Sequence, residues 1–145
     1  MTAVAGDGSG PMPGGGPIVT RLGSGGPWEA RFGYSRVVRV GPLALTAGCT
    51  STVDGRVAHV GDAAAQTAQA LRIGLAALAE VGAEPADVIR TRMYVTDRSY
   101  ADEVGRAHNA VFGAVRPAAT MVVVAGLIDP EHLVEVELEA YVGER

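Results

Sequence analysis

Residues 134–142 read VEVELEAYV, the clearest structural signal in this chain of 145 residues. Small or branched apolar residues alternate there with acidic ones: Val134, Glu135, Val136, Glu137, Leu138, Glu139 and Ala140. Successive side chains of a strand point to opposite faces, so a period of two predicts a strand with one apolar and one acidic face. The apolar face has to pack against a second layer of structure.

The residues before this strand predict further strands of the same sheet and the helices of the second layer. Residues 88–96 alternate in the same way and predict a strand, and the β-branched run at 120–127 predicts another. Between them, residues 100–113 predict a helix that Asp97 or Ser99 caps. An earlier helix is predicted by apolar residues at helical spacing: Ala68, Leu71, Leu75 and Leu78. Asp62 is the expected N-cap of this helix, and Gly82 is expected to end it.

The first third of the chain predicts short strands. Residues 35–40 and 43–48 form a hairpin around Gly41-Pro42, and 53–57 contain an Asp-Gly turn. Residues 18–22 are a further strand candidate, and the Gly-rich stretch 23–27 is expected to be a loop. Residues 1–16 are nearly all small, Gly or Pro, which predicts a flexible tail, with a single domain over 17–145.

This order of elements predicts an α+β fold, with two helices on one face of a mixed β-sheet. Two helices leave the other sheet face without cover from the same chain, so the sequence predicts that copies of the chain associate through it.

Composition excludes several classes of function. Hydrophobic residues make up 48% of the chain, enough for a core, and the net charge is −4. All 12 basic residues are arginine, so no lysine can form a Schiff base or a Walker-A site. An acidic balance disfavours nucleic acid and anionic membranes as partners. With no signal peptide or membrane span apparent, we expect a cytoplasmic protein.

Three glutamates in one row are the most unusual chemical feature. Glu135, Glu137 and Glu139 repel one another unless cations or water offset their charge, and arginines such as Arg90 and Arg92 are candidates for such pairing. The simpler interpretation is a solvated, ion-paired face. The functional one is that a glutamate in a cleft moves a proton or positions water, with its pKa raised by its neighbours.

Other polar residues give weaker signals. His108 lies on the apolar side of its helix, where a core or interface role is the simpler interpretation than catalysis. The three histidines show no metal-ligand spacing, and no metal is expected. Cys49 follows a strand, and we expect a small buried thiol.

Residues 116–141, RPAATMVVVAGLIDPEHLVEVELEAY, resemble the C-terminal signature of the Rid family, the YjgF-type reactive-intermediate deaminases once called L-PSP endoribonucleases. Supporting stretches are GYSRVVRVG at 33–41, LTAG at 45–48, VIRTRMYVTD at 88–97 and EVGRAHNAVFG at 103–113. The resemblance extends from about Phe32 to Val142.

The resemblance implies a chorismate-mutase-like α+β fold that assembles as a homotrimer, with clefts between neighbouring subunits. Deaminating members of the family hydrolyse reactive enamines and imines to a ketone and ammonia without a cofactor. The resemblance therefore implies a small-molecule substrate, hydrolase chemistry and no cofactor.

The family's functional positions carry over in part. Members that deaminate 2-imino acids have an arginine after Pro-Ala that grips the substrate carboxylate, and this chain has Ala119 there. Thr120 fits the small hydroxyl position that follows. The acid that handles water matches Glu137, or Glu135 if the preceding turn is shifted. Tyr34 matches the tyrosine at the cleft entrance, and His108 falls where the family has a tyrosine.

Loss of the arginine predicts weak binding of the usual 2-imino acids, since a charged hydrogen bond contributes about 1.5–3 kcal/mol. We expect a wider, more apolar cleft, with Trp28 at its rim or covering a subunit edge. An enzyme acting on an imine, enamine or tautomerisable carbonyl is the first hypothesis. A non-catalytic small-molecule binder or partner-stabilising trimer is the second, and ribonuclease activity the least favoured, because no aromatic stacking platform is apparent.

Overall fold

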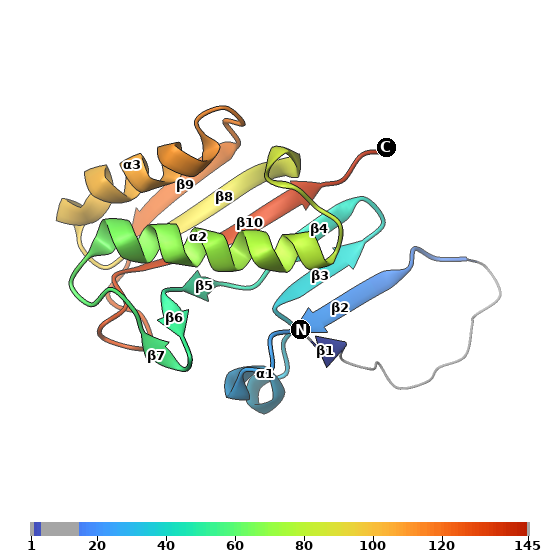
Figure 1. The fold of residues 1–145 in the computed structure, drawn as a ribbon, viewed down its shortest axis with the longest axis horizontal. Coiled ribbons are helices and arrows are strands. Elements are labelled where there is room, and N and C mark those ends of the chain that lie inside the picture. The colour runs from blue at the N-terminus through green and yellow to red at the C-terminus, as the bar shows by residue number, and fades with distance from the viewer. Residues whose placement is uncertain (1, 4–14, 145) are drawn as a thin grey trace.

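The computed structural model describes residues 2–3 and 15–144, and it has the predicted α+β architecture, a mixed sheet with helices on one side (Figure 1). The main sheet has the order β1-β2-β3-β4-β10-β8-β9, and β5 also pairs with β10. Its strands are Thr2–Ala3 (β1), Val19–Gly23 (β2), Val37–Val40 (β3), Leu43–Thr46 (β4), Cys49–Thr50 (β5), Val88–Val95 (β8), Ala118–Val123 (β9) and Val134–Tyr141 (β10). All pairings are antiparallel except β8 with β9.

Most strands and hairpins form within a few residues of their predicted positions, but β9 begins and ends earlier than the strand predicted at 120–127, and β5 was not predicted. Gly41, with φ of 55°, turns β3 into β4, and Asp54 and Gly55, both with positive φ, join the small hairpin Thr52–Val53 (β6) and Arg56–Val57 (β7). Such left-handed turn residues match the right-handed twist of the flanking strands. Of the predicted tail, Thr2–Ala3 pairs with β2, and most of the remainder lies outside the described residues.

Both long helices were predicted. Helix α2, Ala63–Glu80, begins where Asp62 accepts a hydrogen bond from the Ala65 N–H at 2.9 Å, and Gly82, with φ of 84°, follows its end. Helix α3, Ala101–Phe112, connects β8 to β9, as a parallel pair of strands requires. Short 3-10 turns at Pro85–Asp87 and Arg98–Tyr100 precede β8 and α3, and Asp97 caps the second of them.

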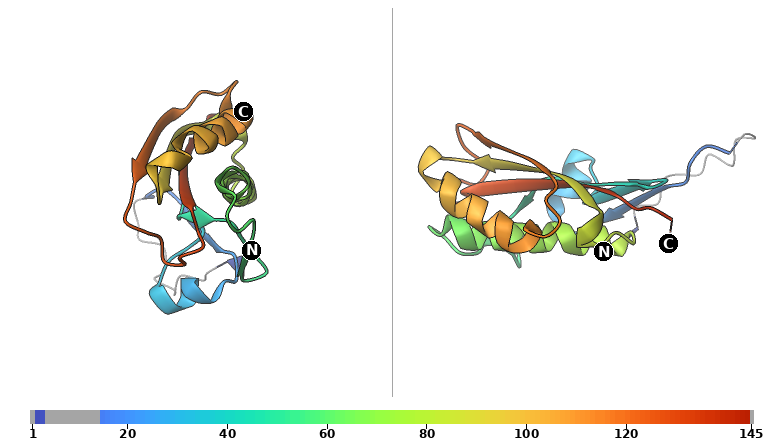
Figure 2. Two further views of the ribbon diagram at one scale, coloured as in Figure 1. Left: turned by 90° about the vertical axis from the view of Figure 1, so that its left-hand side faces the viewer. Right: turned by 90° about the horizontal axis from the view of Figure 1, so that it is seen from above.

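One short helix was missed. Residues Pro27–Phe32 form α1, at the end of the stretch expected to be only a loop. Proline at its first position and Gly33 in the left-handed conformation (φ 73°) after its end are the usual start and stop signals of a helix. Helix α1 lies at one end of the sheet, apart from α2 and α3 (Figures 1 and 2).

Helices α2 and α3 pack side by side on one face of the sheet (Figure 2). The buried face of β10 meets α2 there, and Leu71, Leu78, Val136 and Leu138 are fully buried. Gly74 allows this close approach, because a Cβ at that position would lie 2.9 Å from Cδ1 of Leu138. Among the described residues, no helix has the length and hydropathy of a membrane span.

The opposite sheet face, called here the open face, has no helix over it in the described part of the chain (Figure 2). Strand register assigns residues of seven strands to this face: Val19, Arg21, Val38, Val40, Leu43, Leu45, Thr50, Arg90, Arg92, Tyr94, Ala118, Thr120, Val122, Glu135, Glu137, Glu139 and Tyr141. The uncovered face expected from the sequence is therefore present, with apolar residues toward β3 and β4 and charged ones toward β8 and β10.

Candidate functional site

The acid row of β10, defined as Glu135, Glu137 and Glu139, lies on the open face beside β8. The antiparallel register places Tyr94 opposite Glu135, Arg92 opposite Glu137 and Arg90 opposite Glu139. Side chains of residues directly opposite in a sheet are close enough to interact. The row therefore faces two arginines and a tyrosine.

Glu137 is held by two groups of β8. The Tyr94 hydroxyl donates a hydrogen bond to Glu137 Oε1 at 2.6 Å, and Arg92 Nη1 lies 3.7 Å from the same oxygen. The hydrogen bond to Glu137 is the main reason that the pKa of Tyr94 is raised, with burial second. These two contacts hold one oxygen of the carboxylate in place. Because the Glu137 side chain is 30% exposed, the carboxylate is also accessible from the open face.

Arg92 is shared between two carboxylates. It donates to Glu139 Oε1 at 2.6 Å as well as facing Glu137. This confirms the expected pairing of the acid row with Arg92. Arg92 therefore balances one of these two carboxylates, and Arg90, opposite Glu139 on the same face, is a second cation beside the row.

Thr120 shares this face, whereas Ala119 does not. The parallel register sets Thr120 of β9 opposite Arg92, and Ala119 opposite Thr91, whose side chain points to the helix side. The two residues were expected in one cleft with Glu137. A single chain does not bring Ala119 to Glu137, because neighbouring residues of a strand alternate between the two faces.

His108 lies with Thr91 on the helix side. Its Nε2 hydrogen-bonds the Thr91 hydroxyl at 2.8 Å, and its ring centroid lies 5.0 Å from that of Phe112. Burial lowers the pKa of His108. This is the satisfied, partly buried histidine of the simpler interpretation, and no contact links it to the acid row within the described chain.

A second polar cluster, called here the Arg36 cluster, consists of Arg36, Glu29, Ser24 and Gly48. Arg36 Nη1 donates to the Gly48 carbonyl at 2.5 Å, and Arg36 Nε lies 3.6 Å from Glu29 Oε1. The backbone N–H of Ser24 donates to Glu29 Oε2 at 2.9 Å, and the Ser24 hydroxyl donates to Oε1 at 2.5 Å. These contacts satisfy a buried ion pair and anchor α1 to the junction of β4 and β5.

Glu135 links the Arg36 cluster to the acid row. Its carboxyl lies directly against Gly48, where an added Cβ would overlap Glu135 Oε1. Burial is the main cause that raises the pKa of Glu135 above its usual range, and the nearby Glu137 adds to it, while His132 and Arg36 oppose it. Sequence reasoning left open which of Glu135 and Glu137 faces a cleft, and both lie on the open face.

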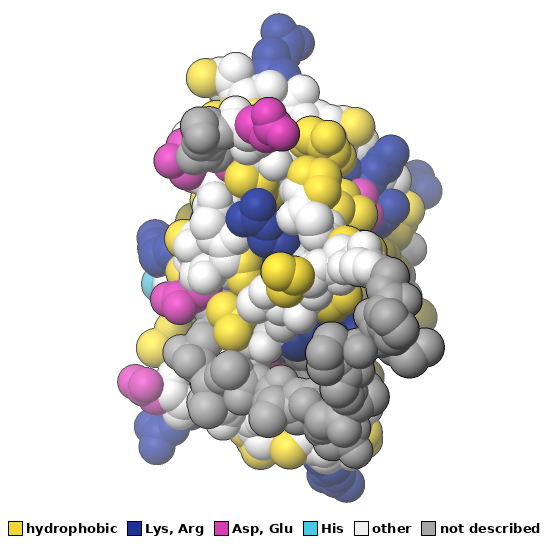
Figure 3. Space-filling model, turned by 90° about the vertical axis from the view of Figure 1, so that its right-hand side faces the viewer, with side chains coloured by type: hydrophobic (Ala, Val, Ile, Leu, Met, Phe, Trp, Pro, Cys, Tyr) yellow, Lys and Arg dark blue, Asp and Glu magenta, His cyan; other side chains and the backbone are white. Residues whose placement is uncertain are grey.

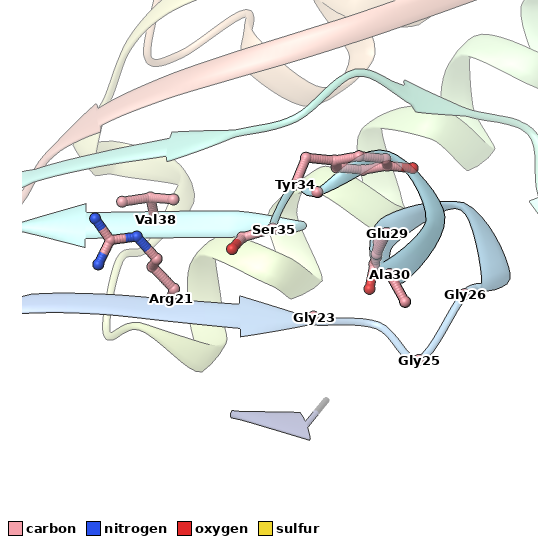
Figure 4. Close-up of a pocket in the computed structure, with 10 residues that line it drawn as sticks. Arg21, Gly23, Gly25, Gly26, Glu29, Ala30, Tyr34, Ser35 and Val38 are labelled. Atoms are coloured by element: carbon pink, nitrogen blue, oxygen red, sulfur yellow. The ribbon is translucent and has the colours of Figure 1, made fainter. Parts of the chain in front are cut away.

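Tyr34 and Trp28 lie near this cluster but at the end of the sheet. The Tyr34 ring packs on Arg36 at 5.8 Å from the guanidinium carbon to the ring centroid, and it lines an open hollow of about 700 Å³ between α1, β2 and β3 (Figure 4). Trp28 is 48% exposed, stacks on Phe32 with centroids 5.4 Å apart, and has Arg31 over its ring. Within the described residues, the ring contacts of these two aromatic residues are with Arg36, Arg31 and Phe32 rather than with the acid row.

Metal-binding groups are not gathered in the described residues: no three His, Cys, Asp or Glu side chains lie together as a metal would require. Cys49 is buried, as expected, and burial raises its pKa, so the thiol is not activated. On the face shown in Figure 3, arginine and acidic side chains are interspersed with hydrophobic ones and form no block of one charge.

Sequence reasoning missed Tyr94, Arg36 and Gly48 as groups around the acids. Alternation along residues 88–96 already separates Arg90, Arg92 and Tyr94 from the buried residues. What the sequence lacks is the strand register, which decides that Tyr94 reaches Glu137 and that Gly48 receives Glu135.

Comparisons with known proteins agree with this architecture. The family model described as Endoribonuclease L-PSP matches residues 27–142. The Streptomyces coelicolor protein SCO2049 is 42% identical over 125 residues, which cover 86% of this chain and 93% of that protein.

Two solved structures show the likeness in three dimensions. The crystal structure of Rv2704 from Mycobacterium tuberculosis, a member of the YjgF/YER057c/UK114 family, is 49% identical with a TM-score of 0.79, covering 86% of this chain and all of that one. The Escherichia coli YjgF gene product is 27% identical with a TM-score of 0.70, covering 83% and 92% of the two chains. Sequence, fold and family model therefore agree that this chain belongs to the Rid (YjgF/YER057c/UK114) family.

Proposed function

We propose that the protein is a cofactor-independent hydrolase of imines or enamines, or a tautomerase, whose substrate is not one of the usual 2-imino acids. Membership of the Rid family supports a small-molecule deaminase or binding role in general. The observation that carries the finer proposal is the Glu137 carboxylate, accessible on the open face and oriented by Tyr94 and Arg92.

We further propose that three copies form a chorismate-mutase-like homotrimer with the sites in clefts between subunits. The open face leaves Leu43, Leu45 and Val122 without a covering layer in the described chain, which supports burial against another copy. The separation of Ala119 from Glu137 on opposite sheet faces supports the same view, because they can share a cleft only if different subunits contribute them.

Glu137 is the proposed acid–base group. An imine carbon is attacked by water once the nitrogen is protonated, and a carboxylate near that water can accept its proton and return it to the departing amine. We expect Thr120, in register with Arg92 across from Glu137, to hydrogen-bond the substrate. We expect Tyr34, Trp28 and His108 to line the cleft from the neighbouring subunit or its rim.

Electrostatics support the proposed substrate class. Ala119 offers no cation for a substrate carboxylate, and Arg92 is already paired with Glu139 and Glu137. The neighbouring Glu137 and Glu139 carboxylates suit an iminium ion, which is cationic. The net charge of −4 argues against RNA, and we propose no nucleic-acid partner.

A non-catalytic binder or partner-stabilising trimer is the second candidate. The pairing of Arg92 with Glu137 favours it, because a salt-bridged carboxylate can serve structure alone. Glu137→Gln separates the two, assayed on a panel of imines that lack a carboxylate. If Glu137→Gln loses most of the turnover above the spontaneous rate, the enzyme is supported. If the wild-type protein binds a ligand without turnover, and Glu137→Gln assembles normally and binds that ligand with unchanged affinity, the binder is supported.

A further inference from the structure

We propose that Glu135 is a second proton-transferring group: it protonates the carbon of an enamine, while Glu137 activates the water. This division of labour rests on the function proposed above and adds a residue to it. The geometry of the two carboxyl groups and the difference between their surroundings carry the proposal.

The two carboxyl groups have the spacing that such a division needs. Residues two apart on one strand point to the same face and lie about 7 Å from each other. Glu135 and Glu137 are such a pair, on the open face of β10. A small enamine bound between them presents its β-carbon to one carboxyl group and its nitrogen-bearing carbon to the other.

Their surroundings differ in the donors available. Glu137 accepts the Tyr94 hydroxyl and faces Arg92, which are contacts of a carboxylate. In the described part of the chain, no group hydrogen-bonds the Glu135 carboxyl, which is half-buried against the Gly48 backbone. Burial without donors disfavours the charged form, so Glu135 is the better reservoir of a proton.

The charged and titratable groups around Glu135 come from four elements. Arg36 precedes β3, His132 precedes β10, Cys49 belongs to β5, and Tyr94 and Glu137 lie on β8 and β10. Arg36 is engaged by the Gly48 carbonyl and by Glu29, which reduces its effect. With burial the largest influence, the pKa of Glu135 is raised. Two carboxyl groups in contrasting surroundings, one without hydrogen-bond donors in the described chain and one held by a hydroxyl and a guanidinium, are typical of an acid and base pair.

The proposed steps balance. The Glu135 O–H proton goes to the enamine β-carbon, whose C=C pair forms the new C–H bond, and the nitrogen lone pair forms the C=N bond of an iminium. Water then adds to the iminium carbon, its proton goes to Glu137, and the C=N pair returns to nitrogen. Glu137 passes that proton to the amine, the C–N bond breaks, and the hydroxyl loses its proton to solvent to leave the ketone. Glu135 regains a proton from solvent.

The experiment uses two probes that need different steps. 1-Morpholinocyclohexene has no N–H, so its hydrolysis requires protonation at carbon. N-Benzylidenemethylamine has no hydrogen on the carbon next to the imine carbon and needs only water addition. Hydrolysis of both is followed above the spontaneous rate for the full-length protein and for Glu135→Gln, Glu137→Gln and, as a control, exposed Glu131→Gln.

We expect Glu135→Gln to lose at least tenfold in kcat on the morpholine enamine and less than threefold on the benzylidene imine, while Glu137→Gln loses both activities. A ¹³C carboxyl titration, assigned with the Glu135→Gln variant, should place the Glu135 pKa above the ordinary value of about 4.3. Equal loss on both probes, no loss on either, or titration of Glu135 at or below the ordinary value overturns the inference alone. Failure of the wild-type protein to accelerate either probe overturns the proposed function, and the inference with it.

Discussion

Removal of one phenol oxygen, Tyr94→Phe, tests whether the orientation of Glu137 matters. The Tyr94 hydroxyl donates to Glu137 Oε1 at 2.6 Å, and Arg92 is the other group on that oxygen, at 3.7 Å. A hydrogen bond to a charged group contributes about 1.5–3 kcal/mol when buried, and partial exposure here reduces this to about 1–2 kcal/mol. We therefore expect kcat/KM on a carboxylate-free imine to fall about five- to thirtyfold, since about 1.4 kcal/mol is tenfold.

Tyr141→Phe is the matched control. Tyr141 lies on the same face of β10 and is 54% exposed, so removal of its hydroxyl should change kcat/KM less than twofold. An independent reading comes from ¹³C-labelled tyrosine: the pKa of Tyr94 should drop toward its usual value in Glu137→Gln, because the hydrogen bond to Glu137 is the main cause of its increase. Unchanged kcat/KM in Tyr94→Phe, or an unchanged Tyr94 pKa in Glu137→Gln, would refute the reasoning.

Two further predictions concern stability. Leu138→Ala should lower the free energy of unfolding by about 2–5 kcal/mol in urea denaturation, because Leu138 of β10 is fully buried against α2, and a loss below 1 kcal/mol would contradict that packing. His108 has a lowered pKa in the folded protein, so its neutral form stabilises the fold fully above the unfolded value of about 6.5, and that contribution is lost as the pH falls below it. Relative to His108→Gln, the wild-type protein should thus lose stability between about pH 8 and pH 5 in urea titrations, and equal pH dependence of the two would show that burial of His108 has no such effect.

Periodicity in the sequence predicted most of the fold because the elements bury one face each. The alternation in β10 and the apolar spacing of α2 survive in the structure, as do the Asp62 cap and the turns at Gly41 and Asp54. Helix α1 was not predicted because six residues with exposed aromatic side chains show no amphipathic period, although its proline and glycine mark both ends. Strand order could not be read, since β10 lies between β4 and β8, far from both in sequence.

The sequence predicted several residues of the candidate site but little of the way they are arranged in space. The acid row and its partner Arg92 follow from alternation along two strands. The roles of Tyr94 and Gly48 depend on register, and the separation of Ala119 from Glu137 depends on which face each strand position takes. These are consequences of tertiary pairing, which local patterns do not encode.

The most direct measurement compares one carbon skeleton with and without a carboxylate. The imine of phenylacetaldehyde and 2-imino-3-phenylpropanoate are each generated in place by an amine oxidase or an amino-acid oxidase, and kcat/KM is measured for the wild-type protein and Ala119→Arg. We expect the wild type to gain nothing from the carboxylate, and Ala119→Arg to improve use of the imino acid by about 10- to 100-fold, the range of a charged hydrogen bond. A wild-type preference of tenfold or more for the imino acid would contradict it.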